Sequence, residues 1–337
     1  MSTKMTWLLE HRLCRRLISM PLIVLLAIVM ATSVPLWLPL SWLLGLLYPP
    51  ARAAWRCLAF ITLYLLYECV GLAVSAWLWF RYPVMGRDHQ DYLRANGALQ
   101  SWWANALCRS AKWLFRLQFD VTGEEALNGP GAIVLPRHTS IGDTLLPMYV
   151  YTIPQQLNVR YVLKRELLLD PCLDTAGHRL PNVFLNRAAE DMSPELQSLT
   201  ELAANAGNDA IVLYVEGTRF SEQKRQQLLR RLIEKGNSAA ADRAKAWTHV
   251  LPPRPAGALA LMDAAPEKDL LFFAHHGFEG AASFASLFNG SWLNTTVKMH
   301  FWRVPAAELP SDDHARRELL FDQWQRMQDC IEEMRKR

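Results

Sequence analysis

Two long stretches near the beginning of the chain lack the alternation of polar and apolar positions that is typical of a soluble fold. Residues 17–48 carry no formally charged side chain, and residues 57–80 carry only Glu68. A helix of about 20 residues crosses the hydrocarbon core of a membrane, so each stretch is long enough to span it. Three prolines in the first stretch predict a helix over about 17–34, followed by a break and a tilted or interfacial remainder.

Beyond residue 96 the pattern changes to short apolar runs separated by amphipathic or turn-rich segments. The runs that read as strands are 132–135, 160–163, 183–185, 211–215, 270–273 and 296–302. The segments that read as helical or turn-rich are 194–206, 222–247, 256–265 and 314–334. Strands that alternate with helices favour an α/β fold with a mainly parallel sheet and helices on both faces.

The segment 100–119 combines tryptophans and leucines with Arg109, Lys112 and Arg116. Such a pattern is typical of a helix that lies in a membrane interface, or of a helix that packs on a domain core. We therefore expect a membrane anchor at 1–96, with apolar segments at about 17–48 and 57–80 and a polar linker, and one domain at 97–337 that begins with the interfacial helix.

The net positive charge of the chain comes wholly from the predicted anchor. Residues 1–96 hold nine Lys or Arg and four acids, a net of +5, which leaves 27 basic and 28 acidic residues for the domain. A nucleic-acid binder would carry its excess on the folded domain, so that class is disfavoured. Seven of the nine cations lie at the outer ends of the predicted hairpin and two in its connection, which places both termini and the domain in the cytoplasm. Six scattered cysteines without a C-x-x-C pair favour reduced thiols over disulfides or zinc.

The first chemically suggestive cluster, R-H-T-S-I-G-D at 137–143, follows a predicted strand. On a helix, His138 and Asp143 would point about 140° apart, so they meet only if the backbone turns between them. Gly142 permits such a turn. A histidine held by a carboxylate is the arrangement that a general base requires. No motif places a protein nucleophile, so the base would activate a hydroxyl of the substrate.

The second cluster, E-G-T-R at 216–219, follows the next buried strand candidate. A glycine between a carboxylate and an arginine exposes backbone N–H groups beside a guanidinium. That combination suits a phosphate monoester, which arginine binds with two hydrogen bonds. A surface turn with a Glu–Arg ion pair is the alternative interpretation of these four residues.

Together the two clusters resemble the glycerolipid acyltransferase family, which contains the 1-acylglycerol-3-phosphate acyltransferases. That family shows H-x4-D, then a G…F…R block, then E-G-T-R, then a proline-bearing strand. Here the second block resembles Gly177 followed by V-F-L-N-R at 183–187, and the fourth resembles H-V-L-P-P-R at 249–254. The blocks span roughly 120–265 and are similar to one branch of the family, which contains lysophosphatidate and lysocardiolipin acyltransferases. Arg137 stands where the family usually has asparagine, and Val215 where many members have proline.

The resemblance implies a role for each matching residue. His138 would deprotonate the free hydroxyl of a lysophospholipid, and Asp143 would orient it. Five residues would bind the acceptor phosphate: Glu216, Gly217, Thr218, Arg219 and Arg187. Two would shape the donor side: Pro252 and Arg254. An extra cation at Arg137 could favour a more anionic lipid head.

We therefore expect a membrane-bound enzyme that moves an acyl chain from a thioester to 1-acylglycerol-3-phosphate, giving phosphatidate. Its partners would be the thioester donor, the lysophospholipid acceptor and the bilayer, with no nucleic acid. The donor, acyl-CoA or acyl carrier protein, is a substrate, and neither a cofactor nor a metal is implied. The alternatives are an acyltransferase for another lysophospholipid, such as lysocardiolipin, and a catalytically silent lipid-binding protein.

Overall fold

The computed structural model describes residues 3–140, 142–186, 191–234, 236 and 238–336. The chain forms two compact units, each assembled from separate segments. The helical unit consists of Met1–Leu117, Arg160–Met192 and Phe284–Asn294. The sheet unit consists of Gln118–Val159, Ser193–Ser283 and Thr295–Arg337.

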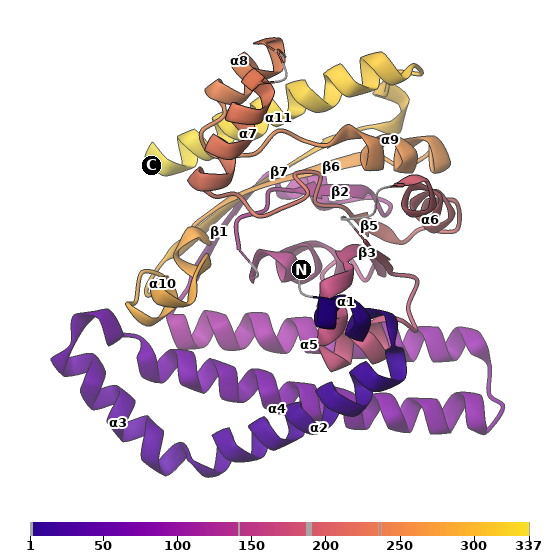
Figure 1. Ribbon diagram of the computed structural model, residues 1–337. Helices are drawn as coiled ribbons and strands as arrows, with labels where there is room; N and C mark the ends of the chain where they lie inside the picture. The colour runs from indigo at the N-terminus through magenta and orange to yellow at the C-terminus, as the bar shows by residue number, and fades with distance from the viewer. Residues whose placement is uncertain (1–2, 141, 187–190, 235, 237, 337) are drawn as a thin grey trace. The chain divides into compact units, whose positions relative to one another are not determined.

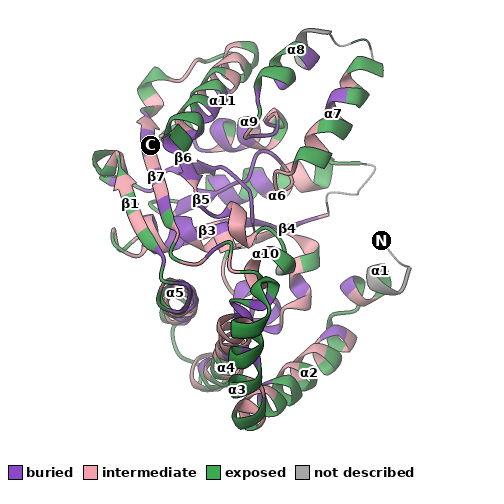
Figure 2. Ribbon diagram, turned by 90° about the vertical axis from the view of Figure 1, so that its left-hand side faces the viewer, coloured by how far each residue is buried: buried purple, intermediate pink, exposed green. Residues whose placement is uncertain are grey.

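The helical unit is built on five helices, shown in indigo to magenta in Figure 1. They are α1 (Thr3–Glu10), α2 (Arg12–Thr32), α3 (Val34–Leu47), α4 (Ala54–Trp79) and α5 (His89–Phe115). Two helical stretches, Arg12–Thr32 and Pro49–Val84, are long and apolar enough to cross a membrane. Much of α2 and α3 is exposed (Figure 2), including large apolar side chains such as Leu17, Leu36 and Leu47. Exposed apolar surface of this extent marks contact with a membrane or another protein.

The first apolar helix begins earlier than its uncharged stretch. It starts at Arg12 and ends at Thr32, and Ser33 separates it from α3, whereas Pro21 and Pro39 lie inside helices. The charged first turns are held by Asp174, which accepts hydrogen bonds from Arg15 (2.6 Å) and Arg16 (3.0 Å). Tertiary contacts that sequence patterns do not reveal therefore extend this helix into its charged end.

The segment predicted as a polar linker is largely helical. Helix α5 begins at His89, where the Asp88 carboxylate caps it by accepting the N–H of Asp91. It ends at Phe115, so Phe119 at the end of the predicted interfacial helix lies in a strand instead. An aspartate before a polar first turn is a helix-start signal. The predicted helix began only at residue 100, because the residues before Trp102 are mostly polar.

Glu68, the one charge in the second apolar stretch, is fully buried and fully paired. Its two carboxylate oxygens accept the indole N–H of Trp103 (2.8 Å) and the backbone N–H of Cys172 (3.2 Å). These bonds link α4 to α5 and to the segment 160–192, so the carboxylate has a structural part in the helical unit.

The sheet unit contains five strands in the spatial order β1-β7-β6-β2-β5. They are β1 (Gln118–Thr122), β2 (Ile133–Pro136), β5 (Ala210–Val212), β6 (Leu270–His276) and β7 (Thr296–Val304). Strand β2 pairs in parallel with both β5 and β6, β1 pairs in parallel with β7, and only β6 and β7 are antiparallel among these pairs of described strands. A further parallel pair, β3 (Val159–Lys164) with β4 (Val183–Leu185), falls mainly in the helical unit. The predicted mainly parallel sheet is confirmed.

Helical segments cover both faces of the sheet in this unit. Helices α9 (Pro255–Ala264) and α11 (Asp313–Lys336) pack over one face, with α6 (Ser193–Ala204) against α9 (Figure 1). The helical turns at 142–152, which follow β2, lie on the other face. Helices α7 (Glu222–Glu234) and α8 (Ser238–Ala246) occupy the segment predicted as helical at 222–247. Because β2 and β5 are neighbouring parallel strands, the loops that follow them begin at the same edge of the sheet, which brings their polar residues together.

Candidate active site

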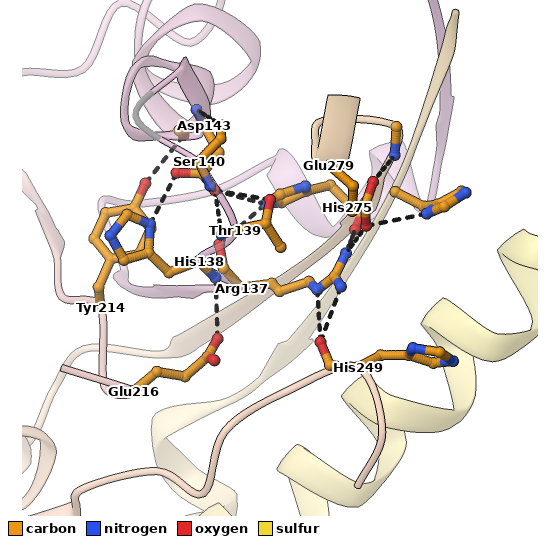
Figure 3. A network of polar contacts seen from close by, with 12 residues as sticks. Arg137, His138, Thr139, Ser140, Asp143, Tyr214, Glu216, His249, His275 and Glu279 are labelled. Carbon is orange, nitrogen blue, oxygen red and sulfur yellow. Dashed lines mark hydrogen bonds and ion pairs between the residues drawn. The ribbon is translucent and has the colours of Figure 1, made fainter. Parts of the chain in front are cut away.

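His138 and Asp143 meet at the end of β2. The loop between them turns back, as Figure 3 shows, and the Nδ1 atom of His138 lies 2.9 Å from Oδ1 of Asp143. The imidazole packs on the ring of Tyr214, with 4.5 Å between ring centroids, and the histidine is only 6% exposed. Since the carboxylate accepts a hydrogen bond from the Nδ1–H group, Nε2 of the neutral ring carries no proton and is its basic atom.

The other oxygen of Asp143 fixes the loop itself. Oδ2 accepts the backbone N–H groups of Thr139 (2.5 Å) and Ser140 (2.8 Å), and the Tyr214 hydroxyl donates to the Asp143 carbonyl (3.0 Å). Burial would raise the pKa of Asp143, but the hydrogen bond and charge of His138 outweigh burial and lower it. The aspartate is thus an ionised, immobile partner for the histidine.

Arg137 does not face an acceptor site. It is 1% exposed, and its guanidinium donates to Glu279 (2.5 Å), to the His275 carbonyl (2.7 Å) and twice to the His249 carbonyl (Figure 3). Burial opposes ionisation of Glu279, but His276 and Arg137 lower its pKa well below its usual range. The expectation that Arg137 favours a more anionic head has no support, because the cation is neutralised inside the sheet unit.

His275 is a further member of this network, for which the sequence had favoured a chance pair with His276 over a place bordering the site. It is fully buried, and its Nε2 donates to the carbonyl of Arg137 (3.0 Å). Burial lowers its pKa, so the ring is neutral and its 3.7 Å approach to Asp143 is not an ion pair. Two histidines at the end of an apolar strand were the available signal, and such a pair commonly occurs by chance.

Glu216 joins the first block to the fourth. One oxygen accepts the backbone N–H of His138 (3.0 Å), and the other accepts that of Leu251 (2.9 Å). Its side chain is 2% exposed, and burial raises its pKa to about 8 against the effect of these two N–H donors. A buried carboxylate with both oxygens occupied is a brace between two loops, which differs from the phosphate-binding role that the resemblance implies for it.

The remainder of the E-G-T-R loop is more accessible. Gly217 has φ of +72°, a left-handed conformation that favours glycine, and Thr218 and Arg219 are half-buried. The Lys224 ammonium donates to the Thr218 hydroxyl (2.7 Å) and to the Arg219 carbonyl (3.0 Å). Lys224 is not part of the E-G-T-R motif, so the resemblance did not place it beside this loop.

A pocket of about 590 Å³ opens beside the loop. Its lining includes Thr218, Pro252 and Arg254, so the two predicted donor-side residues do border one cavity with this loop. The charged residues in its lining are Glu216, Lys224, Arg231, Arg243, Arg254 and Glu318. Of these, Glu216 is buried and Arg243 forms an ion pair with Glu318 (2.8 Å), which leaves an excess of positive charge for an anionic ligand.

One predicted site residue, Arg187, lies outside the described residues. Within the described ranges, no three His, Cys, Asp or Glu side chains come together in an arrangement that could hold a metal ion. The histidine, its aspartate, the brace and the E-G-T-R loop all lie in the sheet unit.

Comparisons with known proteins agree with this arrangement. A family model described as acyltransferase matches residues 118–256. The fold is shared with the crystal structure of the 1-acyl-sn-glycerophosphate (LPA) acyltransferase PlsC from Thermotoga maritima, at a TM-score of 0.53 and 17% sequence identity. That match covers 84% of this chain and 98% of the other. No curated protein matches the chain by sequence.

The family match spans the site residues identified above except His275, His276, Glu279 and Glu318. The structural match extends the shared fold over most of the chain. Residues 118–256 therefore form an acyltransferase-family domain, and the chain is an acyltransferase enzyme.

Proposed function

We propose that this enzyme acylates the free hydroxyl of 1-acylglycerol-3-phosphate, with an acyl thioester as donor and phosphatidate as product. The observation that carries the proposal is the His138–Asp143 pair, 2.9 Å apart, with Nε2 left as the basic atom of the ring. The name of the Thermotoga maritima enzyme with the same fold gives independent support for this acceptor.

The geometry of this pair supports the following reaction. Nε2 of His138 takes the proton of the acceptor hydroxyl as its oxygen attacks the thioester carbonyl, and Asp143 stabilises the imidazolium that forms. The new C–O bond gives the ester when the C–S bond breaks, and the imidazolium returns the proton to the departing thiolate. No protein nucleophile is required.

Cations beside the E-G-T-R loop would bind the acceptor phosphate. Arg219 belongs to the loop, and the Lys224 ammonium is held against the loop by its hydrogen bonds to the Thr218 hydroxyl and the Arg219 carbonyl. Arg254 approaches Gly217 so closely that a Cβ there would lie 3.1 Å from its Nε atom. Glu216 acts as a positioning residue in this proposal, because it ties the His138 backbone to the Leu251 backbone. The adjacent cationic pocket suits a phosphorylated portion of either substrate.

The apolar helices α2 and α4 would hold the enzyme in the bilayer that contains its acceptor. Both are long enough to span it. The excess of basic residues at their outer ends favours a cytoplasmic location for the acyltransferase domain.

The test is thiol release by the full-length protein in detergent, with long-chain acyl-CoA and either lysophosphatidate, lysocardiolipin or no acceptor. We expect release that requires lysophosphatidate, and a loss of about 10²–10⁴-fold in kcat for His138→Ala. His89→Ala is the matched control, since His89 is exposed at the beginning of α5 and lies outside the four family blocks.

Release with lysocardiolipin alone would move the acceptor to that lipid. Unchanged turnover in a folded His138→Ala protein would refute the mechanism. Silence with both acyl-CoA and acyl carrier protein as donors would favour the lipid-binding alternative over an enzyme.

A further inference from the structure

A second pocket, of about 610 Å³, lies wholly within the helical unit. Its walls come from the beginning of α2, the end of α4, Tyr92 of α5 and the segment 175–179. Three arginines line it, Arg12, Arg16 and Arg179, and its described lining contains no acidic residue.

The lining changes from cationic to apolar along α2. Arg12, Arg16 and Met20 are spaced by four residues, so they share one face of this helix. On α4 the pocket is bordered by Leu72 and Ala76. A ligand that fits this gradient has an anionic end beside the arginines and an apolar end that runs along the two helices.

The arginines are only partly neutralised. Asp174 accepts hydrogen bonds from both Arg15 and Arg16, so one carboxylate serves two guanidinium groups. Arg179 donates to the Ser75 carbonyl (2.7 Å) and stacks over Tyr92. Burial lowers the pKa of Arg179, and the charges of Arg16 and Arg12 lower it further. Arg12 is exposed and makes no hydrogen bond or ion pair that the structure describes.

A polar side chain in the same wall lacks a partner. Ser75 lines the pocket and is 2% exposed, and its hydroxyl forms no hydrogen bond with any described residue. A buried hydroxyl without a hydrogen bond is unfavourable by about 1–3 kcal/mol, so native proteins rarely leave one unless a ligand or water satisfies it. The Ser75 hydroxyl would supply a ligand with a hydrogen bond next to the three arginines.

We infer that this pocket binds the headgroup of an anionic glycerophospholipid, with its phosphate beside Arg12, Arg16 and Arg179 and its acyl chain along Met20, Leu72 and Ala76. The exposed Trp79 at the end of α4 is of the type enriched where helices leave a membrane. The inference does not depend on the proposed reaction.

The experiment measures equilibrium binding of labelled dioleoylphosphatidate to the full-length protein in micelles, with dioleoylphosphatidylcholine as competitor. All proteins carry His138→Ala, so that no lipid is turned over. We expect saturable phosphatidate binding that phosphatidylcholine does not displace. Arg12→Gln should weaken it about 10-fold, since one charge-assisted hydrogen bond is lost, and Ser75→Ala a few-fold.

Arg52→Gln is the matched control, because Arg52 is also exposed and lies between α3 and α4, outside the pocket. It should bind phosphatidate like the parent protein. Equal affinity for the two lipids, or equal effects of Arg12→Gln and Arg52→Gln, would overturn the inference. Displacement by inorganic phosphate at the same concentration as phosphatidate would show a free-phosphate site and would refute the lipid assignment.

Discussion

Polar and ionisable groups are paired to different extents in the two units of the molecule. In the sheet unit, all four carboxylate oxygens of Asp143 and Glu216 accept hydrogen bonds from the loops that they hold. In the helical unit, Asp174 serves two arginines, while Arg12 and the Ser75 hydroxyl have no partner among the described residues. Groups whose hydrogen bonds are all formed within the protein hold a fixed geometry, as catalysis requires. Groups without a partner can still bind a ligand.

The largest expected effect comes from the fully hydrogen-bonded groups of the sheet unit. Asp143→Asn keeps the shape of the side chain but removes the charge that stabilises the imidazolium, and it can present an amide N–H to His138. We expect kcat to fall by about 10²–10⁴-fold while the fold is retained. Thiol-release kinetics with circular dichroism would measure both, and an activity within a few-fold of the parent would show that the aspartate is only structural.

The next effect concerns the helical unit. Asp174→Asn leaves the buried Arg15 without its carboxylate, so the free energy of unfolding should fall by about 3–5 kcal/mol. Denaturant unfolding in micelles would measure the loss. Arg12→Gln, by contrast, should change stability by no more than about 0.5 kcal/mol, because the side chain is exposed and unpaired. Equal losses in the two variants would remove the distinction between a partnered and an unpartnered cation in this unit.

The smallest effect, taken per pH unit, is a dependence of stability on pH. The pKa of Glu216 in the folded protein is raised to about 8 from 4.5, so between these values the folded state binds a proton that the unfolded state releases. The free energy of unfolding should therefore fall as the pH rises through this window, by at most about 1.4 kcal/mol per pH unit, and level off above pH 8.

Glu216→Gln tests this origin. The variant should lack that slope, and at pH 8 it should be about 1–3 kcal/mol less stable, because its amide group meets one of the two backbone N–H groups. Denaturant midpoints at pH 5 and pH 8 for both proteins would decide. Parallel pH profiles would show that Glu216 does not titrate in this range.

Local patterns in the sequence predicted the strands of the site and its main residues. His138 and Asp143 follow β2, and the E-G-T-R loop follows β5. Both strands are short, continuous apolar runs, which the hydrophobic pattern alone identifies. The resemblance to a family implied a role for each matching residue, and these roles remain predictions. The roles of Arg137 and Glu216 could not be read in the same way, because their partners, Glu279 and the Leu251 backbone, are distant in the chain.

The helical unit was harder to predict for the same reason. The charged first turns of α2 and the beginning of α5 depend on a buried carboxylate at Asp174 and on a capping bond at Asp88. Neither contact leaves a hydrophobic periodicity in the sequence. The antiparallel pairing of β6 with β7 also depends on long-range packing, although each strand was visible as an apolar run.

The interleaving of the two units along the chain has a consequence for biosynthesis. The helical unit requires residues 284–294, which leave the ribosome after most of the sheet unit has been made, and the sheet unit is completed only by the chain after residue 295. Neither unit can therefore finish folding before the other has begun. A truncated protein that starts at residue 97 would lack the first four helices of the helical unit and leave residues 160–192 and 284–294 without most of their partners. We expect such a fragment to aggregate instead of yielding a soluble enzyme.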